Sequence, residues 1–276
     1  MTDGFLLEAP LLSRLARARA VLVLTGAGMS AESGIPTFRD AQTGLWSRYR
    51  PEDLATTEAF ERDPARVWRW YEERRRAVRG AEPHAGHRAL VELETLLPAV
   101  TIVTQNVDGL HQRAGSTTVW ELHGNILRSR CHVSHRPISA QWLQDSPHQP
   151  PRSPYVKNGL ARPDVVWFGE TLPERPLEAA LAAASGCDFC FSIGTTSWVQ
   201  PAASLPLLAL EHGAAVVEIN PDETPLSPHA QQCIRDRAAS ALVTLVSELR
   251  AAMQENGTAV MTAAGQHTRK ESEHDQ

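Results

Sequence analysis

The chain has little cysteine, no long apolar run and no strong excess of charge, and each absence excludes a class of protein. Four cysteines in 276 residues are too few for a disulfide-stabilised scaffold. The apolar runs are far shorter than a membrane span, and the N-terminal segment lacks the pattern of a secretory signal peptide. A net charge of −5 gives no reason to expect affinity for nucleic acid. These features predict a soluble cytoplasmic protein with a sizeable core.

The most informative segment is residues 21–40, VLVLTGAGMSAESGIPTFRD. Its first four residues predict a strand, and Gly26 and Gly28 follow directly. Glycines let a backbone approach an anion closely, and N–H groups at the start of a following helix supply positive potential. The usual dinucleotide fingerprint has another glycine three residues later, where this chain has Ala31. The segment therefore predicts a phosphate-binding turn that differs from the turn of ordinary dehydrogenases.

Six segments resemble, in order, the motifs of the sirtuins, which are NAD-dependent protein lysine deacylases. They are GAGMSAESGIPTFRD, TQNVDGLHQRAG, ELHGN, RPDVVWFGE, SIGTTSWVQPAA and EINPD. The resemblance implies that the amide oxygen of an acyl-lysine attacks NAD at the nicotinamide ribose. A base then activates a ribose hydroxyl so that the acyl group moves onto the sugar. The implied products are free lysine, nicotinamide and O-acyl-ADP-ribose.

Strand-like runs alternate with helical stretches, which predicts a parallel sheet with crossover helices. Residues 40–85, rich in arginine and tryptophan, and the irregular, proline-rich residues 126–170 interrupt this rhythm. With the resemblance, this predicts an α/β fold: a Rossmann-like parallel sheet with helices on both faces, plus a smaller domain formed by two insertions. The predicted parts of the catalytic domain (12–250) are a core from 12–39, 86–125 and 184–250, and insertions at 40–85 and 126–183. Residues 251–276 are predicted to be a polar, disordered tail.

His123, in the motif LHGN, is the predicted general base. Imidazole titrates near neutral pH and can accept a proton from a ribose hydroxyl. Taken alone, a histidine between a strand and a glycine is more often a packed or loop residue, and the resemblance to the sirtuin HGN motif reverses that balance. Asn106 and Asp108 follow a predicted strand, at the end where open α/β sheets bind ligands. The resemblance assigns Asn106 to the nicotinamide ribose and Asp108 to the nicotinamide amide.

The resemblance further implies an NAD site built from several separate turns. Phe38 would screen the reactive sugar carbon, Arg39 would lie near the phosphates, and Asn220 would bind the adenosine half. Asp236 stands where the family usually has a glycine, beside the predicted adenine contact. The full set of predicted cofactor contacts is Gly26, Ala27, Gly28, Glu32, Pro36, Thr37, Phe38, Arg39, Trp46, Gln105, Asn106, Asp108, Gly194, Thr195, Thr196, Asn220, Pro221, Asp222 and Ala238.

Most sirtuins hold a zinc ion with two pairs of cysteines. The corresponding positions here are Cys131 with Ser134, and Ser153 with Val156. Tetrahedral zinc requires four thiolate or imidazole ligands, so we predict a fold without zinc in which side-chain packing replaces the metal. Three neighbouring residues could form a partial site, although such residues in an irregular segment are more often at the surface. They are Cys131, His132 and His135.

Cys187 and Cys190 have the spacing of a redox or metal-binding pair. They lie in the apolar segment GCDFCFSIG, which predicts a buried strand. Residues three apart on a strand point to opposite faces, so the pair is poorly placed to share a ligand. Because free cysteine is among the most buried residue types, the prediction is two inert core thiols.

Two further segments bear on the acylated substrate. One resembles the sirtuin segment along which a substrate peptide adds as a strand, and it comprises Val165, Val166, Trp167, Phe168 and Gly169. The other is a predicted helix that begins at Asp63 and Pro64, a suitable cap and first helical residue. One face of that helix would carry Val67, Trp70, Tyr71, Arg74 and Val78. Three arginines fall largely off this face, namely Arg75, Arg76 and Arg79.

Tyr71 and Arg74 resemble the pair that marks the desuccinylating branch of the sirtuins, class III. A guanidinium can hold a terminal carboxylate with two hydrogen bonds, and the tyrosine hydroxyl can add a third. An acetyl group would leave these donors unpaired. From periodicity alone, Arg74 could instead extend to water or pair with a nearby carboxylate. The resemblance favours a pocket that prefers succinyl- and malonyl-lysine to acetyl-lysine.

The predicted function is therefore NAD-dependent removal of acyl groups from lysines of protein substrates. One alternative is a mono-ADP-ribosyltransferase, in which a protein side chain attacks the same sugar. Another is a regulatory protein that binds NAD without turnover. The intact HGN and QNVD motifs favour deacylation over both alternatives.

Overall fold

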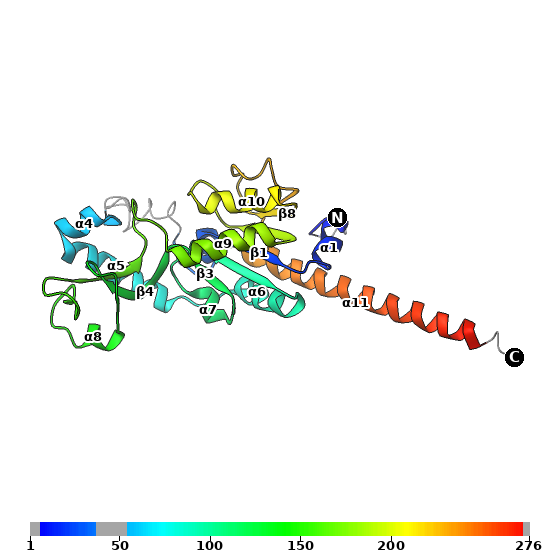
Figure 1. The fold of residues 1–276 in the computed structure, drawn as a ribbon, viewed down its shortest axis with the longest axis horizontal. Coiled ribbons are helices and arrows are strands. Elements are labelled where there is room, and N and C mark those ends of the chain that lie inside the picture. The colour runs from blue at the N-terminus through cyan, green and yellow to red at the C-terminus, as the bar shows by residue number, and fades with distance from the viewer. Residues whose placement is uncertain (1–5, 37–53, 273–276) are drawn as a thin grey trace.

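The computed structural model describes residues 6–36 and 54–272, with side chains up to residue 255. A parallel sheet has the strand order β3-β2-β1-β7-β8-β9 (Figure 1). This is the Rossmann order, in which ligands bind at the carboxyl ends of the strands, where the order reverses. The strands are β1 (Val21–Thr25), β2 (Val100–Thr104), β3 (Val119–Glu121), β7 (Phe189–Ile193), β8 (Ala215–Ile219) and β9 (Gln232–Ile234).

Helices cover both faces of this sheet, because alternate side chains of each strand point to opposite faces. Val21 and Val23 pack on one side with α1, α6 and α11, whereas Leu22 and Leu24 pack on the other side with α9 and α10. The predicted α/β fold class is confirmed. The helices of this region are α1 (Ala9–Leu15), α2 (Ala27–Ala31), α6 (Ala85–Leu96), α7 (Leu110–Ala114), α9 (Glu174–Gly186), the short 3-10 helix η3 (Ala202–Ser204), α10 (Leu205–Glu211) and α11 (Ala238–Ser272).

The second, smaller sheet is antiparallel with the strand order β5-β4-β6. The first insertion supplies α4 and α5, which pack against this sheet through a separate apolar cluster. As predicted, the Asp63 side chain caps α5 by accepting a hydrogen bond from Arg66 N at 3.0 Å. The elements of this domain are α4 (Thr57–Arg62), α5 (Pro64–Gly80), β4 (Gly124–Cys131), β5 (Pro137–Ile138), α8 (Ala140–Gln144) and β6 (Ala161–Val165).

The predicted extent of the second insertion, residues 126–183, requires a correction. Helix α9 begins at Glu174 and buries Ala180 and Ala184 against the large sheet. It is the crossover that leads into β7, so it belongs to the sheet it covers. The small domain therefore ends before α9.

Helix α11 runs into residues 251–276, which were predicted to be a disordered tail. Helix α11 continues through them to Ser272 and extends away from the sheet (Figure 1). Its first part is anchored on the core through Leu242, Leu245 and Leu249. Once a helix is nucleated, each added residue costs little, and alanine, methionine and glutamine favour the extension.

Cys187 and Cys190 are buried, and burial raises the pKa of Cys187 to about 11, which agrees with inert thiols. The prediction that the two thiols point to opposite faces was nevertheless wrong, since both pack in one cluster. Strand β7 begins at Phe189, so Cys187 precedes it and the alternation of a strand does not apply.

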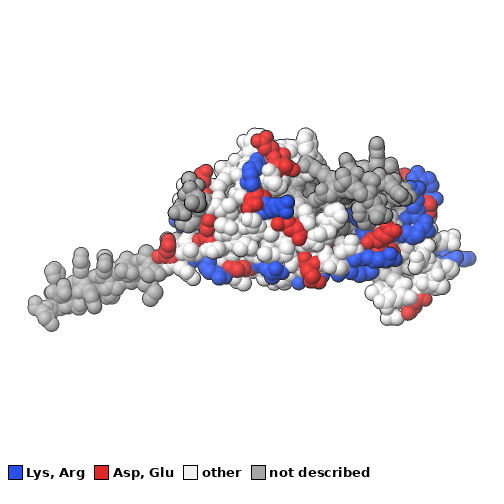
Figure 2. Space-filling model, turned by 180° about the vertical axis from the view of Figure 1, so that it is seen from behind, with Lys and Arg blue, Asp and Glu red and all other residues white. Residues whose placement is uncertain are grey.

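The outer surface carries both signs of charge. Figure 2 shows acidic and basic side chains interspersed over the face seen from behind. Among the described helices, none combines enough length with enough apolar character to cross a bilayer.

Candidate active site

The glycine-rich turn after β1 packs tightly against the end of β7. Gly26 N donates a hydrogen bond to Ile193 O at 3.0 Å, and Gly28 N donates to Gly194 O at 2.8 Å. A Cβ atom on Gly26 would lie 2.7 Å from Thr195 Cα, and one on Gly28 would lie 2.7 Å from Gly194 Cα. Close approach of two turns therefore requires both glycines, in addition to any contact with an anion.

Asn106 and Asp108 are buried and joined through Ser30. The Asn106 side-chain nitrogen donates to Gly26 O at 2.8 Å and to Ser30 Oγ at 3.0 Å. The Ser30 hydroxyl donates to Asp108 Oδ2 at 2.7 Å, and Leu110 N donates to Asp108 Oδ1 at 2.9 Å. Burial raises the pKa of Asp108, although these hydrogen bonds oppose the shift. Sequence reasoning did not single out Ser30, although it lies within the motif GAGMS.

His123 lies in the turn between β3 and β4 with one ring nitrogen already engaged. Its Nδ1 lies 3.0 Å from Gln105 O, and since a carbonyl only accepts, Nδ1 carries the proton. Burial lowers the pKa of His123 below 6.5, so the ring is neutral at pH 7 and Nε2 can accept a proton. The next residue, Gly124, has φ of 78°, and a Cβ atom there would lie 2.2 Å from Asp164 O. Only glycine fits after His123.

The turns after β2, β7 and β8 meet at Thr195. Gln105 Nε2 donates to Thr195 Oγ1 at 2.9 Å, and Asn220 Nδ2 donates to Thr195 O at 2.8 Å. Together with the glycine-rich turn, they form one edge at the carboxyl ends of four strands. Three other predicted contacts are exposed in these turns, namely Thr196, Pro221 and Asp222.

The remaining predicted cofactor contacts within the described residues lie in or just after helix α2 and at the start of helix α11. The Glu32 carboxylate accepts a hydrogen bond from Ala239 N at 2.8 Å, next to Ala238, so these positions share one corner. Ala27 is the first residue of α2, and Pro36 is exposed. Four predicted contacts fall outside the described residues, namely Thr37, Phe38, Arg39 and Trp46.

Three histidines lie beneath the glycine-rich turn, and sequence reasoning missed them. The ring of His87 lies 4.2 Å from that of His84 and 5.0 Å from that of His111, between centroids. His84 Nε2 donates to Met29 O at 2.6 Å, and His111 Nε2 lies 3.0 Å from Thr25 Oγ1. Burial lowers the pKa of His87 to about 2 and that of His111 to about 4. His87 and His111 are therefore uncharged at pH 7.

The predicted substrate segment connects His123 to helix α5. Val166 N donates to His123 O at 2.9 Å. The indole Nε1 of the next residue, Trp167, donates to the Tyr71 hydroxyl oxygen at 2.9 Å. The Phe168 side chain is 50% exposed beside this path, so an apolar ring faces solvent near the base.

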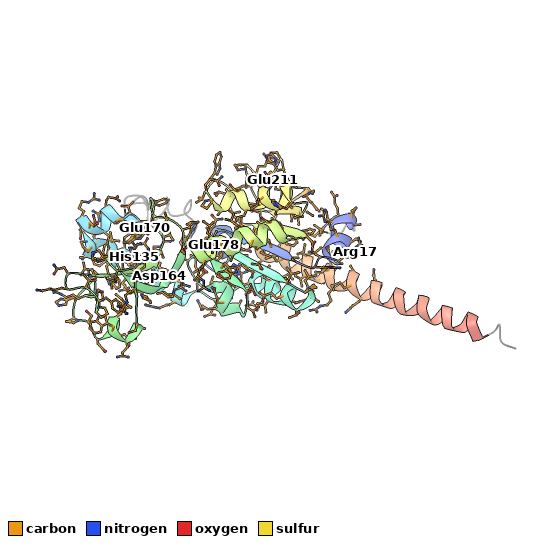
Figure 3. All side chains as sticks on the ribbon, in the orientation of Figure 1. Arg17, His135, Asp164, Glu170, Glu178 and Glu211 are labelled. Carbon is orange, nitrogen blue, oxygen red and sulfur yellow. The ribbon has the colours of Figure 1, made fainter. Side chains whose placement is uncertain are left out.

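A buried ion pair holds the end of that segment. Arg162 donates to both carboxylate oxygens of Glu170 and, at 2.9 Å, to Val165 O. Its guanidinium stacks on the Trp167 ring at 3.2 Å. Burial favours a higher pKa for Glu170, but hydrogen bonds from Arg162 and Trp167 N hold it below its ordinary value. Gly169, with φ of 85°, completes the turn, and Figure 3 shows Glu170 and Asp164 in the small domain.

Tyr71 and Arg74 lie close together at the far end of this path. Burial raises the pKa of Tyr71 to about 12 despite the nearby positive charge of Arg74. The Arg74 guanidinium is stacked 4.8 Å from the centre of the Trp70 ring, and burial lowers its pKa. Since the Tyr71 oxygen accepts from Trp167, its own proton is available to a further acceptor. The two side chains form a pair of donors in an aromatic surrounding.

Arg75 is only 2% exposed, so the prediction that it lies off the packed face of α5 was wrong. Its Nε donates to Ile126 O at 2.5 Å, and a terminal nitrogen donates to Arg128 O at 2.9 Å. Helical periodicity could not anticipate these acceptors, because they belong to β4. The other two arginines, Arg76 and Arg79, are exposed as predicted.

Three of the four positions that correspond to a sirtuin zinc site converge around Gly159, and the fourth, Ser134, contacts Cys131. A Cβ atom there would meet Ser153 Cβ at 2.9 Å, Cys131 Sγ at 3.1 Å and Val156 Cβ at 3.2 Å. Ser134 N donates to Cys131 Sγ at 3.5 Å. One thiol, two hydroxyls and a valine do not fit tetrahedral zinc.

The alternative partial site is not assembled either. His132 Nδ1 accepts a hydrogen bond from Leu160 N at 2.9 Å, and its ring lies 5.6 Å from that of Phe60. Within the described part of the chain, no group of three or more His, Cys, Asp and Glu residues could hold a metal ion. A zinc-free protein stays a prediction.

Comparisons with known proteins agree with this geometry. The sequence profile described as the Sir2 family matches residues 26–201. The chain is 45% identical over 248 residues to NAD-dependent protein deacylase 1 of Archaeoglobus fulgidus, covering 90% of this chain and 100% of that protein. A Sir2 homologue solved with NAD superposes with a TM-score of 0.83 at 44% identity, over 92% of this chain and 98% of the homologue. A mutant Sir2 homologue solved with 2′-O-acetyl-ADP-ribose gives a TM-score of 0.81 at 46% identity, over 90% and 98%. The chain therefore belongs to the Sir2 family.

Proposed function

We propose that this protein is an NAD-dependent protein-lysine deacylase that prefers succinyl- and malonyl-lysine to acetyl-lysine. Family membership, a relative named as a deacylase and homologues bound to NAD and to an acetylated ADP-ribose support the general activity. The acyl preference depends on one observation, the paired donors Tyr71 and Arg74 in a desolvated aromatic surrounding.

NAD would lie along the four turns at the carboxyl edge of the large sheet. Both amide protons of Asn106 are engaged by Gly26 and Ser30, which leaves its Oδ1 as the atom to accept a ribose hydroxyl. Asp108, two residues further, would accept the nicotinamide amide. The turns around Gly194 and Asn220 would hold the adenosine half.

His123 would act as the general base. NAD supplies the ADP-ribosyl group and releases nicotinamide as the leaving group. The Gln105 carbonyl fixes the ring of His123 with Nε2 unprotonated, and Nε2 takes a proton from a ribose hydroxyl. The hydroxyl oxygen then attacks the acyl carbon that is bound to the sugar through its former amide oxygen. Loss of the lysine amine would leave the acyl carbon bonded to two sugar oxygens, and addition of water there would give O-acyl-ADP-ribose beside the free lysine.

An acidic acyl chain would extend from the base towards α5. The adjacent residues Val166 and Trp167 link the two ends, since Val166 N donates to His123 O and Trp167 Nε1 donates to the Tyr71 hydroxyl, each at 2.9 Å. A terminal carboxylate would pair with the Arg74 guanidinium and the Tyr71 hydroxyl. An acetyl group ends before these donors and forgoes the charge-assisted hydrogen bonds that a carboxylate would make with them, a difference of about 1–3 kcal/mol.

The deciding experiment is nicotinamide release from NAD, measured without peptide and with acetyl-, malonyl- and succinyl-lysine peptides. We expect release to require an acylated peptide and kcat/KM to be about tenfold or more higher for the acidic acyl groups. Release with transfer of ADP-ribose to protein would instead identify a mono-ADP-ribosyltransferase. NAD binding without release would identify a regulatory protein. A preference for acetyl-lysine would contradict the assigned pocket.

We further propose that the substrates are acylated-lysine proteins met in the cytoplasm. The free thiols of Cys131, Cys187, Cys190 and Cys233 are compatible with a reducing compartment. Cell fractionation tests the location, and mass spectrometry of acyl-lysines with and without the protein identifies the substrates.

A further inference from the structure

Strand β4 contains a bulge just after the turn that carries His123. The pairing of β4 with β6 shifts register between Asn125 and Ser129. Inside this bulge, Ile126 N donates to Val107 O at 2.8 Å, whereas Ile126 O accepts from Arg75 Nε at 2.5 Å. The backbone of one buried residue thus contacts both the turn after β2 and helix α5.

Arg75 satisfies the acceptors that the bulge leaves without strand partners. Besides Ile126 O, it donates to Arg128 O at 2.9 Å and to Ser129 Oγ at 2.7 Å. Glu72 balances its charge, and its guanidinium lies 4.8 Å from the centre of the Trp68 ring. The fixed fork of a guanidinium carries five N–H donors and suits acceptors spread over several residues, whereas an ammonium carries three donors on one nitrogen. The buried Arg75 side chain therefore holds the bulge through hydrogen bonds to the backbone carbonyls of Ile126 and Arg128.

The contact from Val107 through Ile126 to Arg75 joins the two proposed halves of the site, the nicotinamide turn and the acyl pocket. Val107 stands between Asn106 and Asp108, the residues proposed to hold the nicotinamide riboside. At the other end, Arg75 follows directly after Arg74 and lies one turn beyond Tyr71 on α5. A displacement of Arg75 relative to Ile126 would change the distance between the acyl pocket and the nicotinamide turn.

We propose that Arg75 is a positioning residue that sets the nicotinamide turn, residues 105–108, relative to the acyl-lysine pocket. This inference rests on the proposed roles of Asn106 and Asp108. It predicts that a change at Arg75 alters KM for NAD and inhibition by nicotinamide equally with every acyl group. A change at Arg74, in contrast, would discriminate between acyl groups.

The test uses the full chain with Arg75→Gln, Arg75→Lys and the exposed control Arg76→Gln. KM for NAD, inhibition by nicotinamide, kcat and Tm are measured with acetyl- and succinyl-lysine peptides. For Arg75→Gln we expect KM for NAD to rise about tenfold and nicotinamide inhibition to weaken, by the same factor with both peptides. Arg75→Lys should recover part of this loss, since an ammonium keeps the charge and reaches fewer of the acceptors. Arg76→Gln should match the unmodified protein.

A lower Tm with unchanged KM for NAD and unchanged nicotinamide inhibition would overturn the proposal and leave Arg75 a structural residue. If Arg75→Gln does not fold, Ser129→Ala decides, because it removes one acceptor and should raise KM for NAD about twofold to threefold. No change in that variant would equally overturn it.

Asn106→Ala distinguishes failure of the proposed nicotinamide site from failure of the coupling through Ile126. If Asn106→Ala leaves KM for NAD and nicotinamide inhibition unchanged, the proposed nicotinamide site itself is wrong. If Asn106→Ala shifts both values and Arg75→Gln shifts neither, the site stands and the coupling through Ile126 is wrong.

Discussion

The turns at the edge of the large sheet are joined by short contacts between uncharged groups, whereas buried cations and aromatic rings hold the small domain together. Thr195 gathers hydrogen bonds from Gln105 and Asn220 at the sheet edge. In the small domain, Arg162 and Arg75 are 1% and 2% exposed, and each pairs with a glutamate and stacks on a tryptophan.

This difference has a chemical consequence. The half of the site that would hold NAD depends on groups whose protonation is set by burial, such as His123, His111 and Asp108. The half that would hold the acyl chain depends on guanidinium groups, which stay charged at every pH at which the protein is folded. The two halves should therefore respond differently to substitution and to pH.

The largest effect should come from the base. His123→Ala is expected to lower turnover about 10²- to 10⁴-fold, because a positioned general base is lost after NAD has bound. Binding of NAD, measured by calorimetry, should change little. The exposed histidine His148 gives the control His148→Ala, which should keep full activity. Near-normal deacylation by folded His123→Ala would mean that another residue is the base.

The next effect concerns pH and the histidines beneath the glycine-rich turn. Burial lowers the pKa of His111 to about 4, whereas a histidine of the unfolded chain titrates near 6.5. Between these values the unfolded state binds more protons, so the free energy of unfolding falls as pH decreases from 6.5 to 4. His111 alone accounts for up to about 3 kcal/mol of this loss, and His87 acts in the same direction.

Urea unfolding at pH 7, 5.5 and 4.5 measures this dependence. His111→Gln removes one titrating group, so its stability should fall less steeply with decreasing pH than that of the unmodified protein. Parallel curves for the two proteins would contradict the assigned neutral state of His111.

A smaller and selective effect is expected in the acyl pocket. Arg74→Met should lower kcat/KM for a succinyl-lysine peptide about 10- to 100-fold, because the carboxylate loses its charged partner. For an acetyl-lysine peptide the value should stay within about threefold. Arg76→Met, an exposed neighbour on the same helix, is the matched control. Equal losses of kcat/KM on both peptides would rule out binding of the acyl carboxylate by Arg74.

The smallest effect should follow treatment with a metal chelator. Cys131, Ser134, Ser153 and Val156 offer one thiolate, and Cys131 packs with Trp68, Ile138 and Ala161 where a metal would otherwise be needed. We expect activity and Tm to be unchanged after chelation. Elemental analysis of active, chelator-treated protein should find no stoichiometric zinc, and about one tightly held zinc per chain would contradict the prediction.

Much of the fold and of the NAD half could be predicted from sequence, because the signals are local. Apolar runs followed by glycine or asparagine mark the strands and the turns after them, and Asp63 with Pro64 marks the start of α5. Since parallel strands bring their carboxyl ends to one edge, motifs far apart in sequence had to meet there. The order of His123, Gly124 and Asn125 after β3 likewise belongs to one short turn.

Only the tertiary structure decided which polar side chains are buried and what they contact. Arg75 lies off the apolar face of an isolated helix, yet it is buried because β4 presents carbonyls 51 and 53 residues further along the chain. Packing likewise decided that Cys187 is buried and that His87 is neutral. Continuation of an anchored helix decided how far α11 extends. A residue pattern reports the face a side chain occupies on its own element, whereas the free energy of burying a polar group depends on partners that only folding brings within reach.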